Sequence, residues 1–252
     1  MLIEQTMEKL VAMKLHGMAQ ALRRWMESPK EKAMPAPDLV GLLADAEWSS
    51  RENKKLTARL RSARFRQEAC VEDIDYQHPR GLSKQVMLDL ATCRWVTAHQ
   101  NVIFSGETGT GKSYLACALG QKACREGHSV VYRRTSRLLD ELAQARADGT
   151  HFQLLRRLAK TDVVVLDDFG LEVLNAAQRK DLLEVLEDRY AASSTIITSQ
   201  LEPSDWHPVI GDETIADAVC DRLVHNAHRV KLGGESLRKT KADLTKNSKP
   251  AK

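Results

Sequence analysis

The amino-acid sequence predicts an α/β fold in which helices flank a central parallel sheet, preceded by a smaller all-helical segment. Short apolar runs rich in β-branched residues recur after residue 100, and helical patterns separate them, as in parallel strands joined by crossover helices. A glycine-rich turn joins the first of these runs to its helix. Residues 1–68 have no such run, and their apolar residues recur at helical spacing. The strands are expected at residues 102–105, 129–133, 161–168, 194–198 and 229–232.

Composition limits the classes of protein to consider. The chain has 252 residues, enough for one α/β domain with a smaller appendage. No apolar run approaches the ~20 residues needed to span a bilayer, and the N-terminus shows no secretory signal. The five cysteines are odd in number and contain no C-x-x-C pair, so reduced thiols are expected. These features predict a cytoplasmic protein with no membrane partner.

The N-terminal segment is predicted to be helical. Apolar residues from Ile3 to Trp25 recur at steps of three and four, with a break near Gly17. A second helix, capped by Asp38, begins apolar and becomes strongly basic. Between Arg51 and Arg66 it carries seven basic residues against one acid, a net charge of +6.

This basic segment has two interpretations. A solvated helix face is the common one. The alternative is a polyanion contact, because the charges surround the helix and few acids lie at i+4 to pair with them. Duplex DNA would then bind through phosphate contacts, and acidic lipid is a weaker candidate because the apolar side is thin. The predicted DNA-contacting residues are Arg51, Lys54, Lys55, Arg59, Arg61 and Arg64.

The segment Gly106–Ser113 matches the phosphate-binding pattern G-x-x-x-x-G-K-[ST] between a predicted strand and a predicted helix. Glycines let consecutive backbone N–H groups point at phosphate oxygens, and the helix N-terminus favours the same anion. Lys112 would reach the β- and γ-phosphates of ATP, and the Ser113 hydroxyl would ligate Mg²⁺. A glycine-rich turn that happens to carry a lysine is the alternative, and the strand–loop–helix context disfavours it. The predicted nucleotide-binding residues are Gly106, Glu107, Thr108, Gly109, Thr110, Gly111, Lys112, Ser113 and Tyr114.

A second motif ends the run from Thr161 to Asp168, where four consecutive apolar residues predict a strand buried on both faces. Two carboxylates at its carboxyl end lie where ligands bind in open α/β sheets. Asp167 is predicted to hold Mg²⁺ through water, and Asp168 to polarise the water that attacks the γ-phosphate. Alone this pattern is weak, but its spacing from the glycine-rich loop makes it a Walker B candidate.

Polar residues beyond these motifs complete the predicted site. Gln200, with Ser199 as second choice, follows the next strand and is placed to contact both the γ-phosphate and the attacking water. Arg222 lies at the edge of a helical apolar face, where it either pairs with a neighbouring acid or reaches across a subunit boundary as an arginine finger.

The chain resembles the AAA+ ATPases of the DnaC/IstB branch, and within it the IstB-type helper ATPases of insertion-sequence transposition. The residues that carry the resemblance are Gly106–Ser113 with the residues after it, Leu166–Gly170, Arg189-Tyr190, Ser194–Gln200, Asp221–His225 and Gly234–Arg238. The resemblance spans nearly the whole chain. It implies a central five-stranded parallel sheet in an ATPase domain at 69–238, after a helical DNA- or partner-binding domain at 1–68. The lysine-rich residues 239–252 themselves predict a basic, disordered tail.

The resemblance also implies roles. Arg222 becomes the arginine finger, and Arg238 becomes a second sensor that contacts the γ-phosphate of its own subunit. Asp168 stands where many relatives have glutamate, which implies slow turnover, and Gln200 replaces the commoner asparagine.

The implied function is an ATP-dependent regulator that forms a ring or helical homo-oligomer on double-stranded DNA, remodels it and recruits or stimulates a transposase. The alternatives are a replicative helicase loader, a nucleotide-gated scaffold with negligible turnover and a small-molecule P-loop kinase. A kinase would not need a finger, two sensors or a basic helical N-terminus. The chain shows no recognisable nuclease module, so it is not expected to join DNA strands itself.

Overall fold

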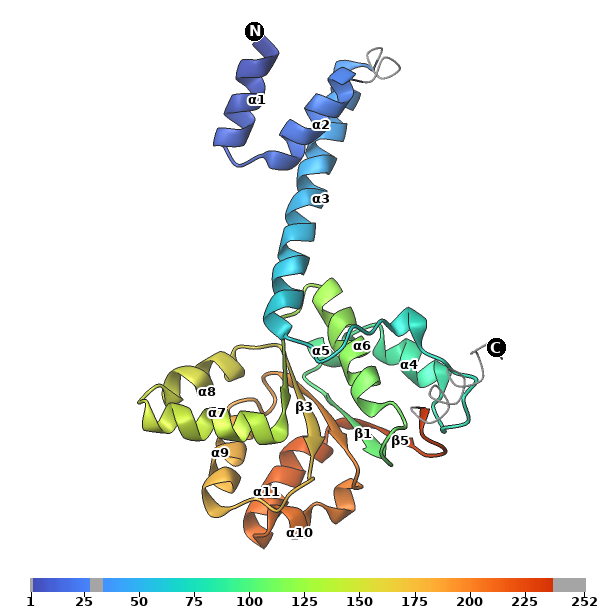
Figure 1. Ribbon diagram of the computed structural model, residues 1–252, viewed down its shortest axis with the longest axis vertical. Helices are drawn as coiled ribbons and strands as arrows, with labels where there is room; N and C mark the ends of the chain where they lie inside the picture. The colour runs from blue at the N-terminus through green and yellow to red at the C-terminus, as the bar shows by residue number, and fades with distance from the viewer. Residues whose placement is uncertain (1, 28–33, 238–252) are drawn as a thin grey trace, which may run out of the picture. The chain divides into compact units, whose positions relative to one another are not determined.

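The computed structural model describes residues 2–27 and 34–237, and it divides the chain into two compact units, Met1–Ala58 and Arg59–Lys252 (Figure 1). The predicted tail at 239–252 and the predicted sensor Arg238 lie outside the described residues. Among the residues described, no helix is both long and apolar enough to cross a membrane.

The N-terminal unit is helical, with α1 at Leu2–Ala12, α2 at His16–Glu27 and the beginning of α3, which spans Ala36–Ala63. The chain breaks at Lys14, which has a φ of 61°, rather than at Gly17. Gly17 instead lies in the first turn of α2, where a Cβ would come 2.5 Å from the Ala46 carbonyl oxygen of α3. The lack of a side chain at Gly17 therefore lets α2 and α3 pack closely, and the Gly17 amide donates a hydrogen bond to Glu47 Oε2 at 2.7 Å.

The second unit contains a five-stranded sheet in the order β2-β3-β4-β1-β5, and every pairing is parallel. The predicted parallel five-stranded sheet is therefore confirmed. Its strands are β1 at Asn101–Gly106, β2 at Val130–Arg134, β3 at Val163–Phe169, β4 at Ser194–Ser199 and β5 at Ala227–Leu232.

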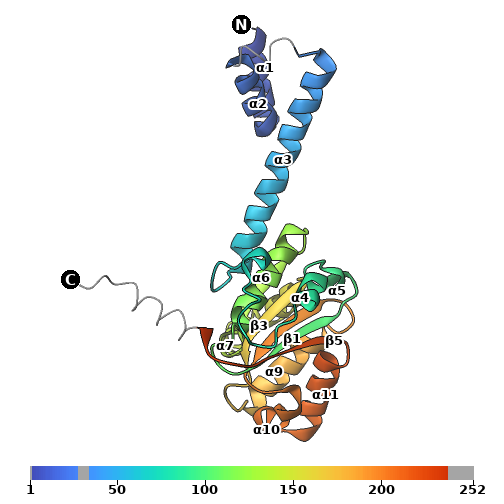
Figure 2. The ribbon, with the colours of Figure 1, turned by 90° about the vertical axis from the view of Figure 1, so that its right-hand side faces the viewer.

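Helices connect the strands of this unit and cover both faces of the sheet (Figures 1 and 2). After the short 3-10 turn Val71–Asp73 they are α4 at Lys84–Leu90, α5 at Arg94–Thr97, α6 at Lys112–Arg125, α7 at Thr135–Ala147, α8 at His151–Ala159, α9 at Ala176–Glu187, α10 at His207–Ile210 and α11 at Glu213–Val224. A second 3-10 turn, Pro203–Asp205, precedes α10.

Side-chain alternation explains these layers. Ile103, Leu166 and Ile197 are paired across β1, β3 and β4, and they point into one apolar cluster with residues of α7 to α11. The intervening strand residues, such as Phe104 and Val165, are fully buried on the opposite face, where α6 packs. Because the strands are parallel, their carboxyl ends meet at one edge, where β1 gives way to the glycine-rich loop.

Arg189 is one of the residues that carry the family resemblance, and its contacts stabilise the fold. Its guanidinium is buried and donates hydrogen bonds to the carbonyl oxygens of Leu158, Thr161 and Ser194. Burial lowers the pKa of Arg189 to about 10. This arginine therefore fastens the end of α8 to the start of β4, at the sheet edge opposite the glycine-rich loop.

Candidate nucleotide-binding site

The glycine-rich loop between β1 and α6 adopts backbone conformations that only glycine accepts easily. Gly106 and Gly109 have φ values of 133° and 92°. A Cβ on Gly106 would come 1.9 Å from the Leu232 carbonyl oxygen, and one on Gly109 would come 2.1 Å from Ser236 Oγ. Both glycines are therefore needed for the close approach of β5 and the residues after it.

Two segments distant in sequence brace this loop. Arg80 is buried, and its guanidinium donates to the carbonyl oxygens of Thr110 at 3.0 Å and Asp75 at 2.9 Å. From the other segment, the Leu237 amide donates to the Gly109 carbonyl at 3.0 Å. Burial lowers the pKa of Arg80. Sequence reasoning missed this arginine, because a turn residue before the loop carries no local signal of such a contact.

The helix α6 begins at Lys112, as the motif predicts. The Lys112 Nζ donates to the carbonyl oxygens of Gly106 at 2.6 Å and Glu107 at 2.8 Å, and its side chain is largely buried. Ser113 and Tyr114 follow in the first turn and are half-buried. The Tyr114 hydroxyl donates to the Cys70 carbonyl at 3.4 Å. The lysine ammonium is therefore held over the loop that it is predicted to serve.

A cavity of about 370 Å³ opens over the loop, in the size range of small-molecule sites. It collects predicted site residues from the loop, α6, β3 and the end of β4, namely Thr108, Gly109, Gly111, Lys112, Ser113, Tyr114, Asp168 and Gln200. It also includes residues that were not predicted for this site: Arg66, Gln67, Arg134, Leu171 and Leu237. Gly106, Glu107, Thr110 and Asp167 lie beside or beneath the lining rather than in it.

The two carboxylates at the end of β3 have different surroundings. Asp167 is fully buried and accepts hydrogen bonds from the Tyr132 hydroxyl at 2.5 Å and from Thr198 Oγ1 at 2.6 Å. Burial and the contact with Asp167 raise the pKa of Tyr132, so the phenol remains a donor. Asp168 lines the cavity with its side chain 27% exposed. One carboxylate is thus fixed by the protein, and the other faces the cavity.

A β-bulge produces this difference. The register of β3 against β4 shifts between Leu166 and Phe169, and Asp168 takes a φ of 59°. The Asp168 amide donates to Thr198 Oγ1 at 3.0 Å, so one hydroxyl on β4 holds both acidic residues. Thr198 was not predicted as a site residue, although its position two residues before Gln200 marked the strand that carries it.

The end of β4 carries Gln200 and Ser199, the first and second choices for the residue that contacts the γ-phosphate and the attacking water. Gln200 is exposed and lines the cavity. Ser199 is fully buried, donates to the Phe169 carbonyl at 2.8 Å and accepts from Trp206 Nε1 at 3.3 Å. The Ser199 hydroxyl is therefore used in packing β4 against the loops, and it does not reach the cavity.

Two arginines that were not predicted here lie against the acidic pair. Arg66 Nη1 is 3.7 Å from Oδ2 of both Asp167 and Asp168, and Arg134 Nε is 3.7 Å from Asp168 Oδ2. Arg66 was counted only as part of the basic segment, and Arg134 ends β2. They place two positive charges beside the predicted water-polarising carboxylate.

The donors at this site fit a magnesium ion. Mg²⁺ prefers oxygen ligands and retains several waters. Ser113 offers a hydroxyl in the cavity lining, and Asp167 Oδ2 lies 3.7 Å from Arg66 Nη1, another residue of the lining. Ser113 and Asp167 are the predicted residues that would hold the ion; Asp167 is fully buried with both oxygens in hydrogen bonds to Tyr132 and Thr198, whereas Asp168 is the carboxylate that shares the cavity lining with Ser113.

Arg222 lies away from this cavity. Its guanidinium pairs with Glu187, donates to the Ala218 carbonyl at 2.8 Å and lies 6.0 Å from the centre of the Tyr190 ring. The Arg222 carbonyl accepts from Asn101, which begins β1. Arg222 therefore lies at the amino edge of the sheet, opposite the glycine-rich loop, and its acidic partner is not one of its neighbours in sequence.

The predicted DNA-contacting residues divide between the two units. In the first, Arg51 pairs with Glu47 at 2.7 Å and Lys55 pairs with Glu52 at 2.9 Å. In the second, Arg59 Nε donates to the Cys124 carbonyl at the end of α6 at 2.9 Å. The exposed members of the set are Arg51, Lys54, Lys55, Arg61 and Arg64. Arg59 is half-buried and has a structural contact that its charge alone did not indicate.

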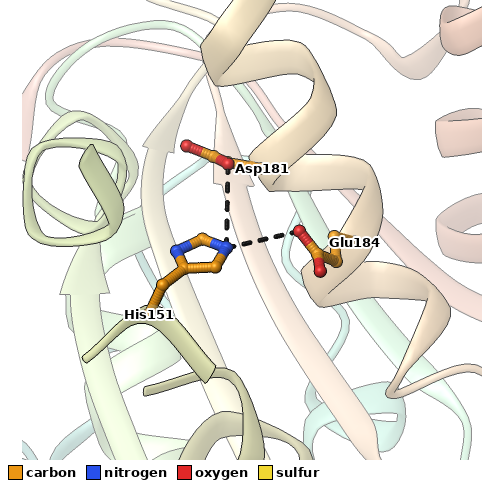
Figure 3. Close-up of side chains that lie close together, drawn as sticks. All are labelled: His151, Asp181 and Glu184. Atoms are coloured by element: carbon orange, nitrogen blue, oxygen red, sulfur yellow. Dashed lines mark hydrogen bonds and ion pairs between the residues drawn. The ribbon is translucent and has the colours of Figure 1, made fainter. Parts of the chain in front are cut away.

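A separate cluster joins α8 to α9 through His151, Asp181 and Glu184 (Figure 3). His151 Nε2 lies 3.3 Å from Glu184 Oε2 and 4.0 Å from Asp181 Oδ1. Arg146 pairs with both acids and lies 3.1 Å from His151 Nε2. The guanidinium thus already serves as the cation of this cluster, which we interpret as a structural ion-pair network.

The fold and the site define a P-loop protein with the AAA+ fold. The solved structure of DnaI has a TM-score of 0.57 at 21% identity, over 66% of this chain and 91% of that one. The DnaC helicase loader has a TM-score of 0.53 at 21% identity, over 65% of this chain and 96% of that one. Both likenesses concern the fold.

Sequence comparison then gives the family. The family model of IstB-like ATP binding proteins matches residues 8–245. A protein of Sinorhizobium fredii described as an insertion sequence ATP-binding protein, y4pL, is 50% identical over 239 residues, which is 95% of this chain and 98% of the relative. The chain belongs to the family of IstB-like ATP-binding proteins of insertion sequences.

Proposed function

We propose that this protein is an ATP-dependent regulator of DNA transposition that assembles on duplex target DNA, remodels it and recruits or stimulates a transposase. The observation that carries the proposal is the cavity in which the phosphate-binding loop, Asp168 and Gln200 converge, in a chain of this family. Binding of ATP would thus control assembly, and strand transfer would belong to the partner.

Within one subunit, each residue of the cavity has a distinct role. Backbone N–H groups of the loop and Lys112 bind the phosphates of ATP. A bound Mg²⁺ would supply charge neutralisation at the phosphate oxygens. Asp168 orients and polarises the attacking water, and Gln200 contacts that water and the γ-phosphate. Asp168 has a shorter side chain than glutamate, so we expect slow hydrolysis.

The site would be completed by a second copy of the chain. Arg222 lies at the sheet edge opposite its own cavity, so it can approach a γ-phosphate only in a neighbouring subunit. Its ion pair with Glu187 is partly exposed on both sides, with side-chain exposures of 22% and 47%, and is therefore exchangeable. This arrangement supports the proposal of a homo-oligomer in the form of a ring or a helix.

Duplex DNA would be bound by the basic segment that begins at Arg51. Its exposed charges can replace counterions on the phosphate backbone without reading sequence. Neutralising Lys54, Lys55 and Arg61 together should weaken DNA binding and lower the salt dependence of the affinity by about two to three units of slope. An unchanged slope would mean that this segment is only a solvated face.

The decisive experiment images the protein with ATP and duplex DNA, and then asks whether the complex captures a transposase or a replicative helicase. We expect an ATP-dependent oligomer on DNA that captures the transposase. Capture of the helicase alone would favour a helicase loader, a function that the DnaC likeness brings into consideration. A monomer indifferent to DNA would favour a small-molecule kinase, and an oligomer without hydrolysis would indicate a nucleotide-gated scaffold.

A further inference from the structure

An open groove lined mainly by arginines adjoins the nucleotide cavity. It has a volume of about 370 Å³ and lies where β2 ends and α7 begins. Its lining residues are Arg64, Arg66, Tyr132, Arg133, Arg134, Arg137 and Glu141. We refer to these residues as the arginine groove. Arg66 and Arg134 also line the nucleotide cavity, so the two sites share one wall.

Two of the five arginines of the groove, Arg64 and Arg137, have no acidic partner in the described part of the chain. Arg133 donates to both carboxylate oxygens of Glu141, at 2.8 and 3.0 Å, which neutralises that pair. Arg64 and Arg137 are exposed, and neither side chain has a hydrogen bond or ion pair with the described part of the chain. Such a cluster of guanidinium groups favours an anion, and guanidinium is the side chain best suited to phosphate.

The backbone adds to this preference. The helix α7 spans 13 residues from Thr135 and begins at the groove, and its N-terminal amides have no side-chain cap. The positive end of the helix therefore reinforces the arginine charges. The groove is open to solvent rather than enclosed, which suits a phosphodiester backbone better than one enclosed ion.

Arg66 and Arg134 connect the groove to the predicted chemistry. Each lies 3.7 Å from Asp168 Oδ2, and both arginine side chains are partly exposed, at 39% and 45%. Ion pairs at this exposure are weak and exchange readily with other anions. Because Arg66 and Arg134 line both the cavity and the groove, each guanidinium has Asp168 on one side and the groove on the other, and a phosphate in the groove competes with Asp168 for it.

We propose that the arginine groove binds phosphodiester groups of DNA, and that Arg66 and Arg134 couple this binding to ATP hydrolysis. DNA phosphates draw these two guanidinium groups away from Asp168. The freed carboxylate is then a stronger hydrogen-bond acceptor for the attacking water, so DNA accelerates hydrolysis. This inference rests on the proposed function, because it takes Asp168 as the water-polarising residue and DNA as the polyanion.

The test compares full-length Arg137→Ala and Arg134→Ala with the wild type and with Arg94→Ala. Arg94 is an exposed arginine on α5, outside the groove and the cavity, so it controls for the loss of one positive charge. Affinity for a labelled duplex is measured over a salt series, and hydrolysis is measured without DNA and at saturating DNA. Inorganic triphosphate replaces DNA in a parallel arm, to identify an effect of free phosphate groups.

We expect Arg137→Ala to weaken duplex binding about fivefold and to lower the salt slope by about one, as for one lost phosphate contact. Arg134→Ala removes one of the two guanidinium groups from Asp168, so hydrolysis without DNA should rise and the further acceleration by saturating DNA should fall. Arg94→Ala should match the wild type, and triphosphate should not accelerate hydrolysis.

Wild-type affinity and slope in both groove variants would overturn the DNA site, as would an equal loss in Arg94→Ala. Weakened binding with wild-type acceleration in Arg134→Ala would overturn the coupling, and so would acceleration by triphosphate alone. A wild-type protein that binds no DNA, or hydrolyses no ATP, would instead refute the proposed function itself.

Discussion

Thr198 offers the sharpest test of how the site is built, because one hydroxyl serves both acidic residues. Its Oγ1 donates to Asp167 Oδ1 at 2.6 Å and accepts the Asp168 amide at 3.0 Å. Thr198→Val keeps the shape of the side chain and replaces the hydroxyl with a methyl group. The change leaves a fully buried carboxylate oxygen and the amide of the β-bulge without this partner.

The expected cost follows from these two bonds. A hydrogen bond to a charged group contributes about 1.5–3 kcal/mol, and an unsatisfied buried group costs about 1–3 kcal/mol. Because the two terms overlap at Asp167, we expect the free energy of unfolding to fall by about 2–4 kcal/mol. For a domain of this size that corresponds to a decrease of about 5–15 °C in Tm. Asp168 would also lose its orientation, so hydrolysis should fall at least about tenfold, a change in barrier of about 1.4 kcal/mol.

Thermal unfolding and steady-state ATP hydrolysis measure these two effects, and Thr198→Ser is the matched control. Serine keeps the hydroxyl and removes one methyl group, which costs about 1 kcal/mol of burial. The serine variant should therefore retain most of the hydrolysis rate. If the valine and serine variants unfold at the same temperature and hydrolyse ATP at the wild-type rate, Thr198 does not hold the acidic pair and the description of the bulge is wrong.

Four further predictions address single groups. Lys112→Ala should lower ATP affinity at least about tenfold in a fluorescent-nucleotide titration, because it removes the ammonium from the loop; an unchanged affinity would refute its phosphate role. Asp168→Asn should bind ATP normally but slow hydrolysis about 100-fold, as for loss of a general base, and a wild-type rate would exclude it from catalysis. Arg222→Ala should spare ATP binding by the monomer and reduce hydrolysis only in the assembly. An equal loss of hydrolysis in the monomer and the assembly would mean that Arg222 acts on the ATP bound to its own subunit. Hydrogen bonding to Arg51 and to amides of α2 lowers the pKa of Glu47, so its contribution to stability is present above its unfolded pKa and is lost as pH falls through the folded value. Protection of the α2 amides from hydrogen exchange should therefore decrease in that acidic range, and Glu47→Ala should remove this pH dependence.

Local sequence was enough to predict much of the fold and part of the site. The phosphate-binding loop has a fixed spacing because every member contacts the same group of phosphates, so Lys112 and Ser113 could be placed from the sequence. Continuous apolar runs such as 163–166 mark strands buried on both faces, and these gave the parallel sheet. Gln200 could be placed in the cavity because it follows a strand next to the one that ends in Asp168.

The remaining site residues depend on long-range contacts. Arg80 braces the loop across 30 positions of sequence, and Thr198 is 31 positions from Asp167. Arg66 and Arg134 come from a basic segment and a strand end, respectively, and only the folded chain brings them to the acidic pair. Their residue types are common on surfaces, so no local pattern could have separated them from solvated charges. The same reason concealed the structural contact of Arg59.

The positions of the cavity and of Arg222 limit the kind of assembly that the proposed function allows. They lie at opposite edges of one sheet, so a subunit that offers Arg222 to a neighbour presents its own cavity on its far side. An interface with two-fold symmetry uses the same patch on both subunits, and two opposite edges cannot both face a partner across one such patch. The contact must therefore be head to tail, which produces a closed ring or an open helix. If ATP and DNA produced only a two-fold dimer, Arg222 could not complete the neighbouring site, and its pairing with Glu187 would be structural alone.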